Sequence, residues 1–381
     1  MNILFCSKCW MNPNEGGVGR VSDILAKYFV SEGHRLYYLN FEYDEKDNYI
    51  FPAEIFLLPD TEFFSNVNLD FYHNLLYQLS IDLIFNHDSS NNRSKFWLNT
   101  GKHHAKIISL HHNDPLYGLN RRSDLSRGLR GFLFKTFPLI FYYLKVLIKK
   151  REINYLLKKS DRLVLLSDEF KLQIKRDLKI NSIKIKAINN PIISYNIQSS
   201  DIKSKQILFV ARLELSQKRP DKMLKIWACL QNKYPDWKLL FLGDGPDRTN
   251  VEEMSKSMEL KNVSFEGFVD PVPYYKESAI LCMTSDYEGF GLVLPEAMQF
   301  GVVPITFNNW ISLKDIIVDY ETGILVRTDD LTDYVTKLDH LMSDVYFRNR
   351  ISANAINHAK KFQIDKIGLK WIRLIEDVFK E

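Results

Sequence analysis

Two glutamates in a glycine-rich segment carry the clearest chemistry in this sequence. Glu288 and Glu296 lie eight residues apart in DYEGFGLVLPEAMQFGVVP (286–304). Between them, Gly289-Phe290-Gly291 predicts a turn in which backbone comes close to another group. The apolar run from Leu292 predicts a helix start, whose free N–H groups suit a diphosphate. Carboxylates repel phosphate, so we expect both glutamates to accept hydrogen bonds from sugar or ribose hydroxyls.

Two cations precede this segment at the end of an expected strand. The run QILFV (206–210) reads as a buried strand, Arg212 follows it, and Lys218 lies six residues further on. A guanidinium and an ammonium that flank one loop can clamp a diphosphate. Ligands of open α/β sheets bind at the carboxyl ends of the strands. The sequence therefore predicts a diphosphate site at Arg212 and Lys218.

A glycine-rich loop follows the first expected strand. The segment NEGGVGR (14–20) contains Gly16 and Gly17 and opens a helix, which is the shape of a phosphate-binding loop. It matches neither G-x-G-x-x-G nor the P-loop with its lysine. Gly243-Asp244-Gly245 also follows a strand but lacks the third glycine. A nicotinamide dinucleotide site is therefore poorly supported.

Two histidines, His111 and His112, end the expected strand 106–110. Their place at the carboxyl end of a strand makes a functional role about as plausible as a structural one. The sequence shows no Ser-His-Asp or Cys-His set, and no D-x-D metal motif in a suitable loop. We therefore expect no metal and no other cofactor.

Strand and helix patterns alternate through both halves of the chain. Apolar runs mark expected strands at 2–6, 35–39, 81–85, 106–110, 162–166, 206–210, 238–242, 262–266, 279–283, 302–306 and 323–327. Helical patterns lie at 18–31, 220–233, 247–258, 291–300, 330–343 and 346–361. This alternation predicts two α/β domains with parallel sheets. We place them at 1–192 and 193–361, because Pro191 and a polar stretch end the first, with a terminal helix in 362–381.

The composition is that of an ordinary globular protein, with 45% hydrophobic and 26% charged residues among 381. A net charge of +4 gives no reason to expect nucleic acid or another polyanion as a partner. Four cysteines fit a reducing compartment, and Cys6 and Cys9, a C-x-x-C without a second ligand pair, are interpreted as ordinary thiols. The N-terminus lacks the pattern of a signal peptide, so we expect a cytoplasmic protein.

One segment departs from this charge balance. Residues 121–159 carry a local net charge of +9, and within them GFLFKTFPLIFYYLKVLI (131–148) is apolar at thirteen of eighteen positions. The run is short for a bilayer span and is interrupted by charge. A basic, aromatic and apolar stretch suits an anionic membrane surface, which we expect to be contacted through 121–151. The alternative is a long core helix with a solvated basic face.

In this order the motifs resemble those of glycosyltransferase family 4, the retaining glycosyl transferases group 1, which have the GT-B fold. The resemblance covers nearly the whole chain and is strongest from 206 to 330. It implies two Rossmann-like domains whose parallel sheets face each other across a cleft, with the terminal helix crossing back to the first domain. The motifs are GGVGR (16–20), VARLELSQKRPDKML (210–224), LLFLGDGP (239–246), FEGFVD (265–270), EAMQFGVVPI (296–305) and TGILV (322–326).

The resemblance also implies roles for individual residues, with the second domain holding a nucleotide sugar. Those implied to bind this donor are Gly16, Gly17, Arg212, Lys218, Val269, Glu288, Gly289, Phe290, Gly291, Leu292 and Glu296. Those implied to act in catalysis are Arg212, Lys218, Glu288, His112 and His111. The family's histidine near the donor sugar corresponds best to His112, with His111 as an open alternative. The family often has Lys-Gly where this sequence has Lys218-Arg219, followed by Pro220.

By the same resemblance, the reaction is sugar transfer with retained anomeric configuration, in which the leaving phosphate helps to deprotonate the acceptor. Family frequency favours a uridine diphosphate sugar. The expected acceptor is a lipid-linked (polyprenyl) glycan or oligosaccharide at the inner membrane face, in bacterial surface polysaccharide synthesis (lipopolysaccharide or capsule). Two alternatives stay open, a nucleotide-sugar epimerase of the same fold and a non-catalytic sugar- or lipid-binding module.

Overall fold

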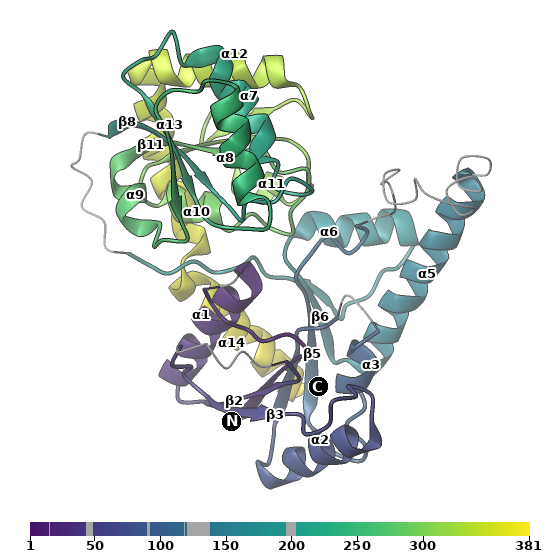
Figure 1. The fold of residues 1–381 in the computed structure, drawn as a ribbon. Helices are drawn as coiled ribbons and strands as arrows, with labels where there is room; N and C mark the ends of the chain where they lie inside the picture. Colours follow the sequence, from purple (N-terminus) through teal and green to yellow (C-terminus); the bar gives the residue numbers. More distant parts are fainter. Residues whose placement is uncertain (15, 43–48, 90–91, 118, 120–137, 196–202) are drawn as a thin grey trace. The chain divides into compact units, whose positions relative to one another are not determined.

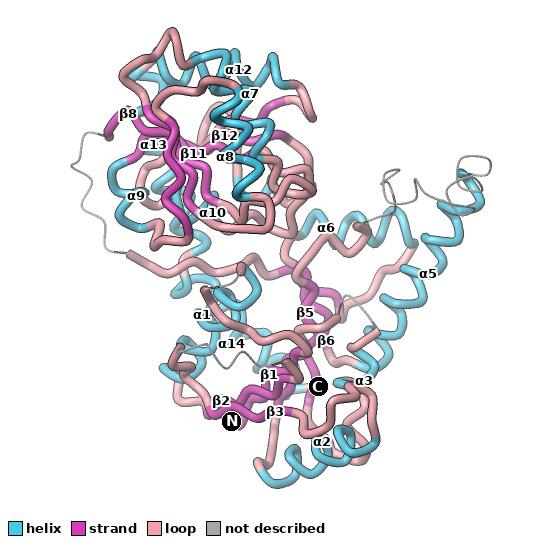
Figure 2. Tube along the Cα trace, in the orientation of Figure 1, coloured by secondary structure: helices cyan, strands magenta, loops and turns pink. Residues whose placement is uncertain are grey.

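The structure, a computed structural model, describes residues 1–381 except 15, 43–48, 90–91, 118, 120–137 and 196–202. The chain divides into two compact units. Unit 1 comprises Met1–Pro191 and Ile364–Glu381, and unit 2 comprises Ile192–Gln363. Each unit is a parallel sheet with helices packed on it (Figures 1 and 2). The α/β class and the parallel sheets predicted from the sequence are confirmed.

Unit 1 has a seven-stranded sheet in the order β3-β2-β1-β4-β5-β6-β7. Its strands are β1 (Asn2–Ser7), β2 (Arg35–Asn40), β3 (Glu54–Leu57), β4 (Leu83–Asn86), β5 (Lys106–His111), β6 (Arg162–Leu165) and β7 (Ile185–Ala187). Its helices are α1 (Gly17–Ser31), α2 (Asn66–Gln78), α3 (Ser94–Trp97), α5 (Pro138–Lys159), α6 (Asp168–Gln173), the π-helix η2 (Ile174–Leu178) and α14 (Ile364–Lys380). The sequence patterns missed β3 and β7, the two edge strands.

The core of unit 1 lies on both faces of its central strands. Ile3, Leu4 and Phe5 of β1 are fully buried in succession, which is typical of a parallel strand covered on both sides. The ring of Phe85 on β4 lies 5.0 Å from that of Phe5 and 5.5 Å from that of Trp371 on α14. The terminal helix is therefore part of the core of the first unit, as the sequence predicted.

Close packing of α14 on α1 depends on one glycine. A Cβ atom at Gly368 would lie 2.4 Å from the ring of Tyr28 on α1, so no larger residue fits without a shift. The two helices lie side by side in Figure 1. Beyond α14, the buried guanidinium of Arg162 donates to both carboxylate oxygens of Glu381, at 2.6 and 3.0 Å. These contacts attach the last residues to the sheet.

Unit 2 has a six-stranded sheet in the order β10-β9-β8-β11-β12-β13. Its strands are β8 (Ser204–Val210), β9 (Lys238–Leu242), β10 (Val263–Gly267), β11 (Ser278–Met283), β12 (Val303–Phe307) and β13 (Ile324–Val326). Its helices are α7 (Pro220–Leu230), α8 (Arg248–Ser257), α9 (Val272–Glu277), α10 (Val293–Met298), α11 (Leu313–Ile316), α12 (Leu331–Ser343), α13 (Val345–Ala359) and the 3₁₀ turn η3 (Lys360–Phe362). One core cluster, with Trp227, Trp237 and Tyr334 at or below 1% exposure, fixes the sheet that carries the candidate site.

Helix α5 is buried at only one end. Near its C-terminus Ile153 and Leu156 are each 2% exposed. Its first half instead projects away from the sheet (Figure 1) and leaves apolar side chains exposed to solvent. The exposed ones are Leu139 (71%), Ile140 (56%), Tyr143 (63%), Leu144 (48%), Leu147 (52%) and Ile148 (54%). The alternative of a core helix therefore does not describe 139–148, while residues 121–137 of the predicted membrane segment lie outside the described residues.

Candidate functional site

The predicted cations and the first glutamate lie in loops at one edge of the sheet in unit 2. Strand order runs in opposite directions from β8 and from β11, so the topological switch point lies between them. Ligands of such sheets bind outside the carboxyl ends of the strands at this point. Arg212 and Lys218 lie in the loop after β8, and Glu288 lies in the loop after β11.

These two loops are joined by side-chain and backbone bonds. The Lys218 ammonium Nζ lies 2.6 Å from Glu288 Oε1, and the side chains are 19% and 9% exposed. The Thr284 hydroxyl donates to the Lys218 carbonyl at 3.2 Å, and the Asp286 N–H donates to the Gln217 carbonyl at 2.8 Å. The ammonium of Lys218 is therefore held in place beside a nearly buried carboxylate.

Arg212 is more exposed to solvent than Lys218 and pairs with a different carboxylate. Its side chain is 58% exposed and forms an ion pair with Glu214. The loop that carries it packs against the loop after β9, because a Cβ atom at Gly243 would lie 2.0 Å from the Ala211 carbonyl oxygen. A Cβ atom at Gly245 would lie 2.5 Å from the Leu213 carbonyl oxygen. The glycines of 243–245 thus serve loop packing around Arg212.

A charge network beside Lys218 was not found from the sequence. The Arg219 guanidinium donates to both oxygens of Asp221 at 2.9 Å and to Asp286 at 3.2 Å. Lys222, 10% exposed, donates to Asp286 at 2.7 Å and to Asp329 at 2.5 Å. Burial raises the pKa of Asp221, but the hydrogen bonds from Arg219 together with the charges of Arg219, Lys225 and Lys222 leave that pKa below its ordinary value. Arg219 itself has φ of 54°, so this network holds the strained residue that immediately precedes α7.

The segment between the two glutamates is largely packed into unit 2. Phe290 is 3% exposed, with its ring 5.6 Å from that of Phe362. Gly291 has φ of 86°, a backbone conformation that favours glycine. The Ser312 hydroxyl donates to the Gly289 carbonyl at 2.9 Å. The side chain of Glu296 is 8% exposed in the first turn of α10, and Val269 is half-buried in the loop after β10.

In unit 1 the switch point lies between β1 and β4. The glycine-rich loop follows β1 and leads into α1. A Cβ atom at Gly16 or Gly17 would meet nothing within 4 Å, whereas one at Gly19 would lie 2.2 Å from the Asn12 carbonyl oxygen. Packing within the protein therefore accounts for Gly19 but not for Gly16 or Gly17, whose surroundings are open.

The two predicted histidines have different environments. His111 is 4% exposed, and its Nδ1 donates to the Asn113 carbonyl at 3.0 Å. His112 is half-buried, and its Nε2 lies 3.0 Å from Nδ1 of His87, at the end of β4. Burial lowers the pKa of both His111 and His112 to about 4, so both are neutral at pH 7. His112 is the more accessible of the two, and His87 is a neighbour that the sequence patterns did not single out.

Neither the cysteines nor the acidic residues form a metal site in the described part of the chain. Cys6 is buried and Cys9 exposed, and both are free thiols. Within the described ranges, no three His, Cys, Asp or Glu side chains are grouped so that they could hold a metal ion. The described helices also include none whose length and hydropathy suit a bilayer span.

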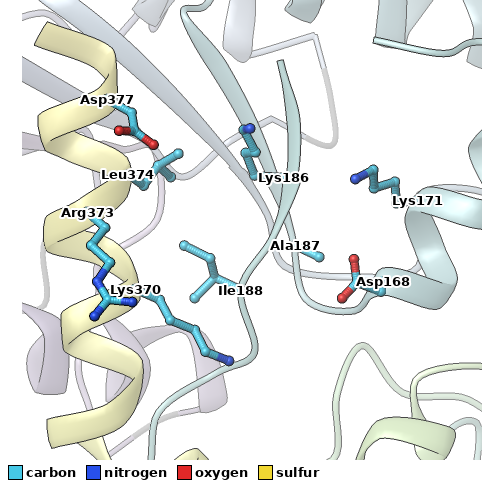
Figure 3. Close-up of a pocket in the computed structure, with 9 residues that line it drawn as sticks. All are labelled: Asp168, Lys171, Lys186, Ala187, Ile188, Lys370, Arg373, Leu374 and Asp377. Carbon is cyan, nitrogen blue, oxygen red and sulfur yellow. The ribbon is translucent and has the colours of Figure 1, made fainter. Parts of the chain in front are cut away.

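Unit 1 also contains an open hollow of about 340 Å³ between α6, β7 and α14 (Figure 3). Both signs of charge line it, and none of the residues predicted from the sequence is among its lining. Its lining residues are Asp168, Lys171, Lys186, Ala187, Ile188, Lys370, Arg373, Leu374 and Asp377.

Comparison with solved structures identifies the fold as GT-B. The chain is similar over its full length to sucrose-phosphate synthase from Thermosynechococcus elongatus, with a TM-score of 0.77, 16% identity and coverage of 100% of this chain and 99% of that one. It is also similar to Anabaena Alr3699/HepE in complex with UDP and glucose, with a TM-score of 0.75, 14% identity and coverage of 99% and 100%. At these identities the likeness establishes the fold alone.

Residues 194–358 match the family model described as glycosyl transferases group 1. The matched segment contains Arg212, Lys218, Glu288 and Glu296. A Campylobacter jejuni relative is named GalNAc-alpha-(1->4)-GalNAc-alpha-(1->3)-diNAcBac-PP-undecaprenol alpha-1,4-N-acetyl-D-galactosaminyltransferase. It is 33% identical over 225 residues, which are 57% of this chain and 60% of the relative. The chain thus spans about 60% of the length of the curated relatives that it matches first.

Proposed function

We propose that the protein is a retaining glycosyltransferase that moves a sugar from a nucleotide sugar, a UDP-sugar, to a lipid-linked or oligosaccharide acceptor in bacterial surface polysaccharide synthesis. One observation carries the proposal. In a glycosyl transferases group 1 domain, Arg212, Lys218 and Glu288 occupy the two loops at the switch point of the sheet. The UDP complex of the Anabaena neighbour, which shares the fold, supports the choice of nucleotide.

In this proposal the loop after β8 binds the diphosphate of the donor. The side chain of Arg212 is exposed, and bonds between the two loops hold Lys218 beside Glu288. An anion could therefore contact both cations without a change in the backbone. Their charge would stabilise the departing diphosphate in the role that a divalent metal plays elsewhere. Glu296 would accept the ribose hydroxyls, and Val269 would lie by the base.

The remaining predicted residues would surround the donor sugar. Glu288 would accept hydrogen bonds from it, with the backbone of Gly289, Phe290, Gly291 and Leu292 beside the phosphate. This fits the burial of the Phe290 side chain, which leaves backbone as the part available. Gly16 and Gly17 would admit phosphate or acceptor, since nothing in the protein crowds them.

The proposed reaction needs no separate protein nucleophile. The bond between the anomeric carbon and the diphosphate oxygen breaks, and the acceptor oxygen forms its bond to the same face of that carbon. The acceptor proton passes to the leaving phosphate. Of the two histidines predicted to act in catalysis, we assign the role of contacting the substrate to His112, because His111 is buried and already bonded to Asn113.

We also propose that α5 attaches the protein to an anionic membrane surface, at the cytoplasmic face of the inner membrane. The exposed apolar residues of 139–148 recur at intervals of four, so they form one stripe along the helix. Lys145, Lys149, Lys150 and Arg151 lie on the same helix. Such a surface would bring the enzyme to a polyprenyl-linked acceptor, the kind of acceptor in the name of the Campylobacter relative.

Vesicle co-sedimentation tests this attachment. The wild-type protein should sediment with phosphatidylglycerol vesicles at low salt and much less at high salt, since the Debye length falls from about 10 Å at 0.1 M to about 3 Å at 1 M. Leu144→Ser with Ile148→Ser should release it. Leu172→Ser with Ile183→Ser is the matched control, because these residues are 58% and 82% exposed elsewhere in unit 1. Equal binding by both double variants would refute the role of α5.

Two assays test the enzymatic proposal. A thermal-shift panel of nucleotides should show stabilisation by UDP and UDP-sugars, which a bound ligand provides by RT ln(1 + [L]/Kd). Incubation of a UDP-sugar with a polyprenyl-diphosphate-linked glycan should add the mass of one sugar to the lipid. Conversion of the donor to another nucleotide sugar without acceptor would favour the epimerase. Binding without turnover of either substrate would favour a non-catalytic module.

A further inference from the structure

The buried histidine His87 contacts His112 through their ring nitrogens. His87 is 6% exposed and directly follows β4. Its Nδ1 lies 3.0 Å from Nε2 of His112 and 3.3 Å from the hydroxyl oxygen of Ser22 on α1. The two ring planes differ by only 14°. An N–H in the plane of one ring can therefore point at the in-plane lone pair of the other.

The contacts of the Ser22 hydroxyl indicate which nitrogen of His87 carries the proton. Ser22 donates its only proton to the Val18 carbonyl at 2.9 Å, and a carbonyl can only accept. Toward His87, Ser22 can then act only as an acceptor. Nδ1 of His87 is therefore the protonated nitrogen, and its N–H is shared between Ser22 and His112.

The opposite tautomer of His87 is disfavoured by its surroundings. It would place the proton on Nε2, which is buried and has no hydrogen-bond partner among the described residues. An orphaned buried donor costs about 1–3 kcal/mol. It would also turn the lone pair of Nδ1 toward the hydroxyl oxygen of Ser22, whose proton goes to the Val18 carbonyl. Both arguments give the same proton position.

The proton position on His87 fixes that on His112. Nε2 of His112 must accept the bond, so a neutral His112 carries its proton on Nδ1. Nδ1 of His111 does not compete for this bond, because it donates to the Asn113 carbonyl. Burial keeps the pKa of His112 near 4, which supports a neutral ring at pH 7.

We propose that His87 is a positioning residue that holds His112 in the Nδ1–H tautomer, so that His112 donates a hydrogen bond to an oxygen of the bound substrate and does not act as a proton acceptor through Nε2. The substrate oxygen, a sugar hydroxyl or a phosphate oxygen, rests on the proposed function. The tautomer rests only on the contacts of Ser22, His87 and His112.

Nitrogen NMR of the free protein tests the tautomer without any activity. Long-range ¹H–¹⁵N correlation spectra of histidine-labelled protein at pH 7 should show a protonated Nδ1 and an unprotonated Nε2 for both His87 and His112. Loss of signals in His112→Gln and His87→Asn variants assigns them. A protonated Nε2 on His112 would overturn the proposal.

Variants of His87 test the consequence for the reaction. His87→Asn keeps an N–H near the position of Nδ1, whereas His87→Leu removes it. We expect His87→Leu to give a mixture of His112 tautomers and to lower kcat/KM by about tenfold, the share of one hydrogen bond. His87→Asn should bring both the His112 tautomer and kcat/KM back toward the wild-type values. Ser22→Ala is the control, because His87 can still donate to His112.

The outcomes distinguish the positioning role of His87 from the proposed function. Equal rates for His87→Leu and wild type would refute the positioning role, and so would failure of His87→Asn to restore the tautomer. If His87→Leu does not fold, the wild-type spectrum and the Asn variant decide. Absence of sugar transfer by the wild-type protein would refute the proposed function, and the wild-type spectrum would still decide the tautomer.

Discussion

The Lys218–Glu288 pair predicts that two substitutions will change nucleotide binding in opposite directions. The ammonium of Lys218 lies 2.6 Å from Glu288, which is 9% exposed. A diphosphate arriving at this ammonium must share it with the carboxylate and is repelled by that carboxylate. Lys218→Met should therefore weaken binding of uridine diphosphate, whereas Glu288→Gln should strengthen it while it impairs transfer.

The geometry sets the expected size of each effect. A charge-assisted hydrogen bond contributes about 1.5–3 kcal/mol, so Lys218→Met should weaken binding about ten- to a hundredfold. Two unit charges at about 4 Å interact by about 4 kcal/mol at an effective dielectric constant of 20. Solvent and salt screen most of this repulsion at an open site, so we expect Glu288→Gln to strengthen binding by only about three- to tenfold.

Isothermal titration with uridine diphosphate at low and high salt measures both effects. Lys233→Met is the matched control, since its ammonium pairs with Asp339 at 2.6 Å on the surface of unit 2, away from the loops of the site. Thermal unfolding checks that each variant is folded. Unchanged binding in Lys218→Met, or equal loss in Glu288→Gln and Lys218→Met, would refute the reasoning.

Three further predictions concern other residues. Arg212→Ala should lower donor turnover at least tenfold, and more at low salt because its side chain is 58% exposed; an unchanged rate would contradict the clamp. Glu296→Ala should damage binding of uridine diphosphate in titrations, whereas Glu288→Ala should damage transfer, and the reverse result would exchange their roles. Burial lowers the pKa of His111 to about 4 from 6.5. Between these two pH values only the unfolded chain therefore takes up this proton. The free energy of unfolding should decrease as the pH is lowered across that range, by on the order of 3 kcal/mol. His111→Asn should flatten that fall in denaturant titrations, and an identical pH slope would exclude His111 as its cause.

The fold could be predicted from the sequence because long apolar runs alternate with helical patterns. The strands missed were β3 (Glu54–Leu57) and β7 (Ile185–Ala187), which are short edge strands with few buried positions. Their pairing depends on neighbouring strands rather than on a pattern of their own. Helix α10 is six residues long, shorter than the pattern over 291–300.

The part of the candidate site that lies at the carboxyl ends of the strands could be predicted from the sequence. Lys218 and Glu288 are seventy residues apart, and the rule that ligands bind at strand carboxyl ends places both at one edge. The partners of Lys222 and the contact between His87 and His112 follow from no spacing rule. They depend on side-chain directions that only the packed structure provides. The roles of the site residues stay predictions until the variants are measured.

The packing of α14 into unit 1 has a consequence for synthesis on the ribosome. Unit 2 is continuous in sequence, from Ile192 to Gln363, and can fold as soon as it has emerged. Unit 1 begins earlier but lacks the helix that covers Tyr28 and Phe85 until α14 has been translated. Its nascent sheet must therefore wait with an uncovered apolar face, during which chaperone binding is expected. The order of completion is then the reverse of the order of translation.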